Sequence, residues 1–176
     1  MFTAYTYRRN CVNKGVINID PQEEIYFMDR MMRESPKNFQ ILEHKKMFVN
    51  MVENWEPEIR FVQMMFSDDA KNYHAWSYLI WLCQAFDLYE ELKPFVETII
   101  EKDVGNNSAW SFRYFLYNSR ESKLNQENAV NQIKYTMEKI KIWEANESAW
   151  NYLKGFLKQF NVKAINYTVD NNMKIG

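Results

Sequence analysis

An asparagine followed four residues later by a tryptophan occurs three times in the chain, and a weaker copy with leucine precedes them. The pairs are Asn38/Leu42, Asn72/Trp76, Asn106/Trp110 and Asn146/Trp150. Successive asparagines lie 34, 34 and 40 residues apart. A period near 34 residues is typical of helical hairpins that stack on one another, because one hairpin cannot bury its apolar face alone.

Each asparagine follows a break in the pattern, and asparagine is among the best N-cap residues. We therefore expect each one to begin the second helix of a hairpin, with its indole on the first turn and in the core. The segments between the motifs carry apolar residues at helical spacing, most clearly Leu88, Leu92, Val96, Ile99 and Ile100. The sequence predicts an all-α fold, an α-α superhelix or crescent-shaped solenoid of about four to five tetratricopeptide-like hairpins.

We expect one repeat domain over 1–176, with motifs near 2–9, 36–48, 70–82, 104–116 and 144–156. The longer last interval maps to the polar stretch Asn118–Asn128, which we interpret as a surface loop. Residues 20–157 are expected to form the ordered crescent. Val162–Gly176 is too short for another hairpin, and we expect it to be an irregular cap or disordered.

Composition excludes several functions. With 22 basic and 23 acidic residues, the net charge of −1 provides no basic field for nucleic acid. No stretch approaches 18 apolar residues, so we expect no membrane insertion. The two cysteines, Cys11 and Cys83, have neither metal-ligand nor disulfide spacing, which predicts reduced core thiols and a cytoplasmic location.

The motifs together resemble successive repeats of the α subunit shared by protein farnesyltransferase and geranylgeranyltransferase type I. The likeness spans about residues 1 to 157 and runs in order. The strings that carry it are Pro36-Lys37-Asn38-Phe39-Gln40, Asp69-Ala70-Lys71-Asn72-Tyr73-His74-Ala75-Trp76, Asn106-Asn107-Ser108-Ala109-Trp110 and Asn146-Glu147-Ser148-Ala149-Trp150. The start, Phe2–Arg9, is similar to a further motif entered just after its asparagine.

The resemblance implies a heterodimer in which these hairpins wrap around a β subunit. Such an enzyme transfers farnesyl or geranylgeranyl from its diphosphate to the cysteine of a C-terminal Cys-aliphatic-aliphatic-X (CaaX) motif. Zinc is expected in the β subunit and Mg²⁺ with the diphosphate, so no metal is assigned to this chain.

The resemblance also implies roles for four residues. Lys37 would bind the isoprenoid diphosphate, Gln40 the carboxylate of the substrate peptide, and Tyr73 and His74 would lie at the active-site rim. Lys37 and His74 are the candidate catalytic residues. A lysine beside a helix N-terminus suits an anionic leaving group, because the cation and the free backbone N–H groups act together. His44 is interpreted as structural.

Several positions depart from the family pattern. Phe39 stands where tyrosine is usual, and Leu42 replaces a tryptophan. The arginine that usually follows the tryptophan by three residues is present as Arg8 and Arg113, becomes Lys45, and is lost at Leu79 and Leu153. Asp68-Asp69 is similar to the aspartate pairs that hold magnesium in isoprenoid synthases, but Asn72 stands where that motif should close, so we reject this site.

Two alternatives remain open at this point. One is an inactive helical-repeat scaffold or adaptor, favoured by Phe39 and by the shortness of the chain relative to the family. The other is the α subunit of a Rab geranylgeranyltransferase, which is built from similar repeats. The sequence does not distinguish a farnesyl from a geranylgeranyl donor, because the β subunit sets that choice in the family.

Overall fold

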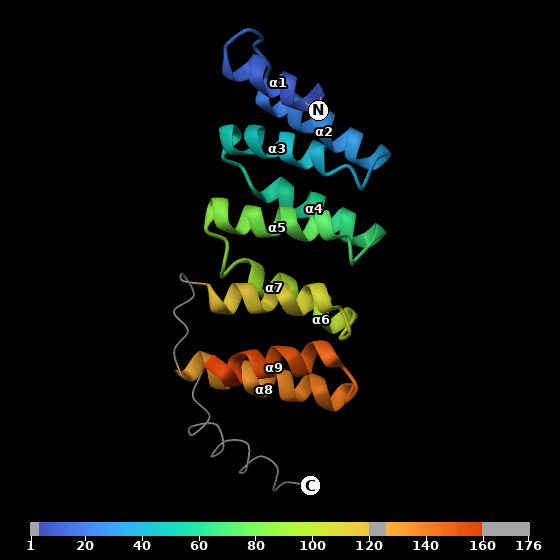
Figure 1. The fold of residues 1–176 in the computed structure, drawn as a ribbon, viewed down its shortest axis with the longest axis vertical. Helices are drawn as coiled ribbons and strands as arrows, with labels where there is room; N and C mark the ends of the chain where they lie inside the picture. Colours follow the sequence, from blue (N-terminus) through green and yellow to red (C-terminus); the bar gives the residue numbers. More distant parts are fainter. Residues whose placement is uncertain (1–3, 120–125, 160–176) are drawn as a thin grey trace, which may run out of the picture. The chain divides into compact units, whose positions relative to one another are not determined.

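The structure is a computed structural model of the chain, and it describes residues 4–119 and 126–159. All regular structure within these two ranges is α-helical (Figure 1). The helices are α1 (Ala4–Asn13), α2 (Pro21–Glu34), α3 (Phe39–Val52), α4 (Glu56–Asp68), α5 (Tyr73–Phe86), α6 (Leu92–Lys102), α7 (Asn107–Asn118), α8 (Gln126–Ile142) and α9 (Glu147–Gln159). The all-α fold class predicted from the sequence is confirmed.

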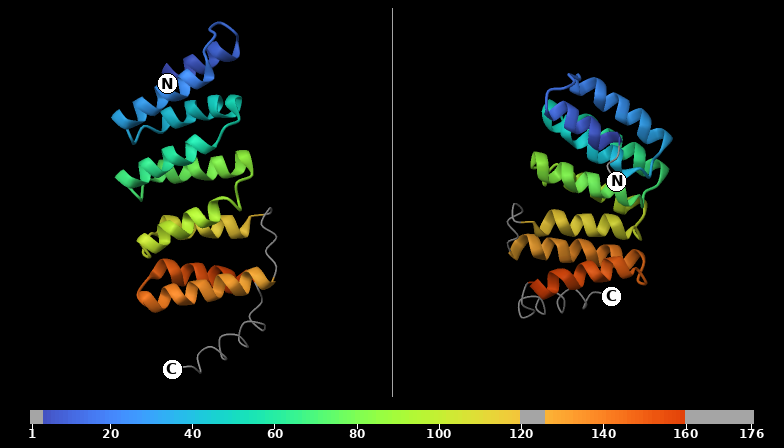
Figure 2. Two further views of the ribbon diagram at one scale, coloured as in Figure 1. Left: turned by 180° about the vertical axis from the view of Figure 1, so that it is seen from behind. Right: turned by 45° about the horizontal axis from the view of Figure 1, so that its top comes forward.

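The helices form two compact units, Met1–Asp87 and Leu88–Gly176. In the first unit, α2 pairs with α3 and α4 with α5, while α1, α3 and α5 pack in succession as second helices (Figures 1 and 2). In the second unit, α6 pairs with α7 and α8 with α9, and α7 packs on α9. Both units are thus built from the predicted hairpins, and the single domain over 1–176 stays a prediction.

The repeated asparagines begin the second helices as predicted. Asn72 Oδ1 accepts hydrogen bonds from the backbone N–H groups of His74 and Ala75 at 3.0 and 3.2 Å. Asn38, Asn106 and Asn146 cap α3, α7 and α9 in the same way. Because Asn72, Asn106 and Asn146 are buried, each cap supplies a partner that water cannot provide to these N–H groups.

The repeated tryptophans hold the turn that precedes their own helix. The indole Nε1–H of Trp76 donates to the Ala70 carbonyl at 3.0 Å, and those of Trp110 and Trp150 donate to the Val104 and Glu144 carbonyls at 2.7 Å. Each accepting carbonyl lies six residues before its indole. The tryptophan therefore closes the turn whose asparagine caps the helix.

One prediction about the tryptophans is wrong. Trp76 and Trp110 are buried, but Trp150 is 38% exposed although it was expected in the core. Tyr135 and Tyr152 from the following hairpin pack on Trp110. Trp150 lies on the last described helix, so no later described helix packs over it in the same way.

Other predictions can be compared with the helix bounds. The expected loop Asn118–Asn128 is shorter at its far end, because α8 already begins at Gln126, and residues 120–125 lie outside the described residues. The expected cap or disorder at Val162–Gly176 also lies outside them. Neither cysteine forms a disulfide within the described residues, but only Cys83 is buried and Cys11 is partly exposed, so the expectation of core thiols holds for Cys83 alone.

A buried cation in the first unit connects helices of two hairpins. Lys45, on α3, is fully buried, and its Nζ lies 2.5 Å from Asp29 on α2 and 2.6 Å from Glu58 on α4. The same Nζ lies 3.7 Å from the centre of the Phe61 ring, a cation–π contact. Tyr78 on α5 completes the set by donating its hydroxyl hydrogen to Glu58 at 2.7 Å.

The second unit repeats this arrangement around Arg113 on α7. Its Nη1 donates to Glu97 on α6 at 2.8 Å, and its Nε and Nη2 donate to Gln132 on α8 at 3.1 and 2.8 Å. Tyr152 on α9 donates to the same Gln132 oxygen at 2.8 Å. A third set lies at the start of the first unit, where Arg8 makes two hydrogen bonds to Glu24 and the ring of His44 makes another.

The three sets occupy equivalent positions of the repeat. Each has a cation on the second helix of one hairpin and a polar partner on the first helix of the following hairpin. A ring on the second helix of that following hairpin lies 20 residues after the polar partner. At the remaining set of equivalent positions all three residues are apolar and buried: Leu79, Leu92 and Phe112. The chain thus carries either the whole polar set or none of it, as expected when an unpaired buried charge costs several kcal/mol.

The apolar set suggests a test of this interpretation. We expect Lys45→Leu to lower the free energy of unfolding by about 3–5 kcal/mol, because Glu58 would stay buried without a cation. The triple variant Lys45→Leu/Glu58→Leu/Tyr78→Phe copies the chain's own apolar set and should recover most of that loss. Urea unfolding followed by circular dichroism measures both effects, and a triple variant as unstable as the single one would contradict the interpretation.

The set around Glu24 should make stability depend on pH. Burial lowers the pKa of His44 and outweighs its hydrogen bond to Glu24, so the ring stays neutral. Burial alone would raise the pKa of Glu24, but hydrogen bonds from Arg8 and His44 outweigh it and hold that pKa below its ordinary value. In both cases the unfolded chain takes up a proton at a higher pH than the folded chain does.

The free energy of unfolding should therefore fall with pH, first below about 6.5 through His44 and then below about 4.3 through Glu24. Thermal unfolding midpoints measured between pH 7.5 and 4 test this expectation. His44→Tyr, which places the tyrosine of the equivalent position 78 beside Glu24, should remove the part between pH 7 and 5. An unaltered profile in His44→Tyr would refute the assignment.

Candidate functional site

The first turns of α3 and α5 lie side by side in the first unit. The side-chain Nδ2 of Asn72, which caps α5, donates to the Pro36 carbonyl in the turn before α3 at 3.4 Å. The rings of Phe39 and His74, each within the first two residues of its helix, stack with centroids 5.8 Å apart and an interplanar angle of 23°. Two motifs that are 34 residues apart in sequence therefore meet at one edge of the unit.

The structure places Lys37 and Gln40 at the start of α3. Lys37 is exposed in the turn before the helix, and its carbonyl accepts from the Phe39 N–H at 3.1 Å. Gln40 is partly exposed, and its backbone N–H is capped by Asn38 at 3.2 Å, which leaves the amide of the side chain uncommitted to the cap. A cation beside a helix N-terminus can bind an anion.

Tyr73 and His74 lie together at the start of α5. The Tyr73 ring is 76% exposed and meets the His74 ring edge to face, with centroids 5.6 Å apart. His74 is partly exposed and lies between Tyr73 and Phe39. These contacts hold the imidazole at an exposed aromatic surface, where it can form a hydrogen bond with a ligand.

A small hollow of about 160 Å³ joins these helix starts. Its lining residues come from α3 and α5: Phe39, Leu42, Glu43, Lys46, Tyr73, His74, Ser77 and Tyr78. Lys46 forms an ion pair with Glu43 at 2.5 Å inside this set. Lys37 and Gln40 do not line the hollow, so the predicted site residues divide into Tyr73 and His74 within it and Lys37 and Gln40 near it.

Sequence reasoning missed Glu43, Lys46 and Ser77. The signal was present, because Glu43 and Ser77 lie four residues after Phe39 and Tyr73, and Lys46 lies three residues after Glu43. These spacings place side chains on one helix face. No sequence motif marks these three positions. The binding roles assigned to the four predicted residues stay predictions.

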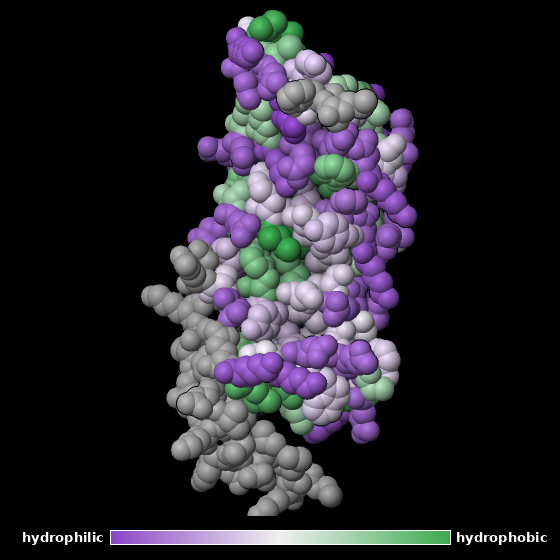
Figure 3. Space-filling model, in the orientation of Figure 1, coloured by the Kyte–Doolittle hydropathy of each residue, from purple (hydrophilic) through white to green (hydrophobic). Residues whose placement is uncertain are grey.

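The described ranges contain neither a cluster of metal ligands nor a helix able to cross a membrane. Within 4–119 and 126–159, no three side chains of His, Cys, Asp or Glu are grouped so that they could hold a metal ion. Asp69 of the rejected Asp68-Asp69 pair instead accepts from the Lys71 N–H at 2.9 Å, as a turn residue. None of the described helices combines the length and apolarity needed to cross a membrane. Polar residues cover most of the face seen in Figure 3, and apolar areas on it are small.

Comparisons with known proteins match the repeats directly. Residues 55–86 and 89–120 match the family model described as protein prenyltransferase alpha subunit repeat. These two segments correspond to the hairpins α4/α5 and α6/α7. No curated protein sequence matches the chain.

A solved structure extends the match over most of the chain. It is Candida albicans protein geranylgeranyltransferase-I complexed with GGPP, and one of its chains superposes with a TM-score of 0.81 at 31% sequence identity. The superposition covers 89% of this chain and 55% of that chain. This chain therefore spans about half the length of the solved chain that it matches.

Proposed function

Because the chain belongs to the protein prenyltransferase α-subunit repeat family, we propose that it is the α subunit of a heterodimeric protein prenyltransferase. In the proposed reaction, the thiolate sulfur of a CaaX cysteine bonds to C1 of farnesyl or geranylgeranyl diphosphate. The C1–oxygen bond breaks, and the diphosphate leaves with the electron pair. The β subunit is expected to hold the zinc that binds the thiolate, Mg²⁺ would accompany the diphosphate, and neither metal is assigned to this chain.

The observation that carries this proposal is the meeting of two helix starts. The Asn72–Pro36 hydrogen bond and the Phe39–His74 stack bring the turn containing Lys37 beside the first turn of α5. All four residues for which the family resemblance implies substrate contacts thus belong to adjacent segments of one unit. A pure scaffold would have no need to keep these four residue types at adjacent helix starts.

Lys37 has the chemistry needed at a diphosphate leaving group. Negative charge grows on the diphosphate as the C1–oxygen bond breaks, so a fixed cation stabilises the transition state more than the ground state. The exposed position of Lys37 in the turn before α3 leaves its ammonium group free to reach a ligand held by the partner. We propose that Lys37 binds the diphosphate, which makes it the principal catalytic residue of this chain.

The other three residues are proposed to position substrate. Gln40 can donate a hydrogen bond from its neutral amide to the C-terminal carboxylate of the peptide. His74, held between Phe39 and Tyr73, can donate to a diphosphate oxygen, and the exposed ring of Tyr73 adds a phenol at the rim. A cytoplasmic location, where thiols stay reduced, is part of the same proposal.

A scaffold without catalytic activity is the second candidate, and Phe39 is the observation that favours it. Its ring is 52% exposed and carries no hydroxyl where the family usually has tyrosine. A hydrogen bond from that hydroxyl to substrate is therefore impossible. The structure of the site is otherwise retained, because Phe39 still stacks on His74.

Co-expression tests the subunit assignment. We expect the chain to aggregate or to have low thermal stability when it is produced alone, because a surface that binds a partner leaves apolar groups exposed in its absence. Together with a CaaX-prenyltransferase β subunit it should elute as a soluble 1:1 complex in size-exclusion chromatography. A stable monomer with no affinity for such a subunit, and no transfer from either a 15-carbon or a 20-carbon donor, would favour the scaffold.

Changing Lys37 tests the catalytic assignment within that complex. Lys37→Ala should lower the single-turnover rate by about 10²–10³, with a smaller effect on donor affinity, because the contact strengthens as charge develops. Lys71→Ala is the matched control, since Lys71 is exposed and occupies the same place before Asn72. Equal losses in both variants would indicate a general effect of positive charge, and an unchanged rate in Lys37→Ala would remove it from the site.

A further inference from the structure

The turns that precede the second helices share one backbone geometry. In each turn a carbonyl accepts a hydrogen bond at 3.0 or 3.1 Å from the N–H of the capping asparagine three residues later: Ser35 from Asn38, Asp69 from Asn72, Asp103 from Asn106 and Trp143 from Asn146. The first three of these accepting residues are also the C-caps of α2, α4 and α6. Their φ and ψ are −139° and 70°, −150° and 97°, and −140° and 91°. Ser35, Asp69 and Asp103 are therefore equivalent positions of the repeat.

The side chain at this position differs between the turns. Asp69 Oδ1 accepts from the backbone N–H of Lys71 at 2.9 Å, and Asp103 Oδ1 accepts from that of Gly105 at 3.0 Å. Ser35 places a neutral hydroxyl at the same point, yet its turn keeps the backbone hydrogen bond of the others. A carboxylate at this position is thus compatible with the turn but is not needed to form it.

The turn around Ser35 carries a net positive charge, and the equivalent turns do not. Residues 33–38 hold two cations and one carboxylate, a net charge of +1. Residues 67–72 and 101–106 each hold one cation and two carboxylates, a net charge of −1, and residues 141–146 hold one of each. An acidic residue at position 35, as in the two turns with aspartate, would bring the first turn to zero.

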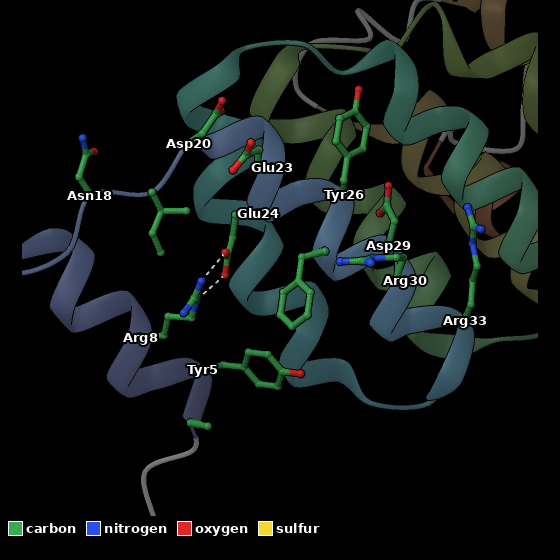
Figure 4. A pocket seen from close by; sticks show the side chains of 13 residues that line it. Tyr5, Arg8, Asn18, Asp20, Glu23, Glu24, Tyr26, Asp29, Arg30 and Arg33 are labelled. Carbon is green, nitrogen blue, oxygen red and sulfur yellow. Dashed lines mark hydrogen bonds and ion pairs between the residues drawn. The ribbon is translucent and has the colours of Figure 1, made fainter.

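The two cations of this turn, Arg33 and Lys37, are both exposed. Within the described residues, neither of them takes part in an ion pair. Figure 4 shows Arg33 at the end of α2, well apart from the Arg8–Glu24 pair at the other side of the picture. Cations without a carboxylate partner keep their charge for an anion that comes from outside the chain.

A carboxylate at position 35 would oppose such an anion. Two residues of extended chain span at most about 7 Å, which is inside the screening length of about 8 Å at physiological salt. Repulsion between the carboxylate and a diphosphate at Lys37 would therefore be only partly screened. Lys71 occupies the same place before its asparagine as Lys37 does, but it stands beside Asp69. The residue two positions earlier thus distinguishes the two lysines.

We propose, on the basis of the function proposed above, that Ser35 admits the diphosphate to the turn of Lys37. It is a positioning residue, because it acts through Lys37 and does not touch the reacting atoms. Its neutral hydroxyl keeps a carboxylate away from the place where Asp69 and Asp103 have one. The same rule excludes a polyanion from the turn of Lys71, so the chain presents one diphosphate-binding lysine although the repeat supplies two.

Ser35→Asp tests the proposal in the 1:1 complex with a CaaX-prenyltransferase β subunit. We expect kcat/KM for the isoprenoid diphosphate to fall at least about tenfold in about 0.05 M salt, because the new charge repels the donor. The loss should become smaller in about 0.5 M salt, which screens that repulsion. The thermal unfolding midpoint should not fall, since Asp69 and Asp103 hold the same turn. A merely structural role of Ser35 would lower activity and midpoint together and would not respond to salt.

Two variants control for shape and for net charge. Ser35→Asn copies the shape and the acceptor oxygen of aspartate without its charge, and it should stay within about threefold of the unaltered complex. Asn54→Asp adds the same charge to an exposed position beyond the far end of α3. That helix of 14 residues is about 21 Å long, well beyond the screening length, so kcat/KM should change less than about twofold.

Three results would overturn the proposal. The first is a Ser35→Asp complex as active as the unaltered one, and the second is an equal loss in Ser35→Asp and Ser35→Asn. The third is a Ser35→Asp chain that no longer folds, because position 35 would then not be equivalent to position 69. An unaltered complex without transfer from either donor refutes the proposed function itself, whereas full activity of Ser35→Asp leaves that function intact and removes only the role of Ser35.

Discussion

A buried cation that needs partners from two hairpins is the interaction on which the stacking of these helices depends. Lys45 draws one carboxylate from α2 and another from α4, and the Glu58 carboxylate then takes a hydrogen bond from Tyr78 on α5. An ammonium group without these partners could not remain fully buried, because its desolvation would cost several kcal/mol. Apolar packing alone would tolerate small shifts between neighbouring hairpins, whereas a set of charged hydrogen bonds accepts only one register.

The sequence spacings show that the polar contact between hairpins is retained although the loops that connect the hairpins differ in length. The polar partner and its ring are 20 residues apart in all three sets, because both belong to one hairpin. The cation and that partner are separated by 16 residues for Arg8–Glu24, 13 for Lys45–Glu58 and 19 for Arg113–Gln132. The loops between hairpins therefore vary in length while the pair across them is retained, as expected if loop insertions cost little.

The sequence predicted those parts of the fold that depend on local chemistry. The asparagine caps and the apolar stripes follow from residues within one hairpin, whereas the hydrogen bonds by which the indoles close their turns were not predicted. Lys45 was identified only as a replaced arginine, and its partners Asp29 and Glu58 were not found, because pairing across hairpins has no local pattern. A signal did exist, since Leu79, Leu92 and Phe112 are apolar together at the equivalent positions. Trp150 was placed wrongly for the same reason: the burial of an indole depends on what packs over it.

In the candidate site, too, the features set by the repeat could be predicted from the sequence, whereas the contacts between helices could not. Tyr73 and His74 could be expected beside the start of α3 because the period of the repeat places equivalent turns next to one another. The stack of Phe39 on His74, and the hollow that also includes Glu43, Lys46 and Ser77, required coordinates. The roles of Lys37 and Gln40 toward a diphosphate and a carboxylate concern atoms outside this chain, so neither a repeat pattern nor a single subunit can establish them.

Asn72 connects the architecture to the site. Its side-chain oxygen begins α5 by accepting from the N–H groups of His74 and Ala75, and its side-chain nitrogen donates to Pro36 in the turn that carries Lys37. In the second unit Asn146 makes the equivalent pair of contacts, capping α9 and donating to Val104 at 2.6 Å, with no predicted site residue nearby. The link between successive turns is therefore a property of the repeat. Substrate-binding residues placed on two such turns are brought together by the same hydrogen bonds that stack the hairpins, so the site needs no separate framework.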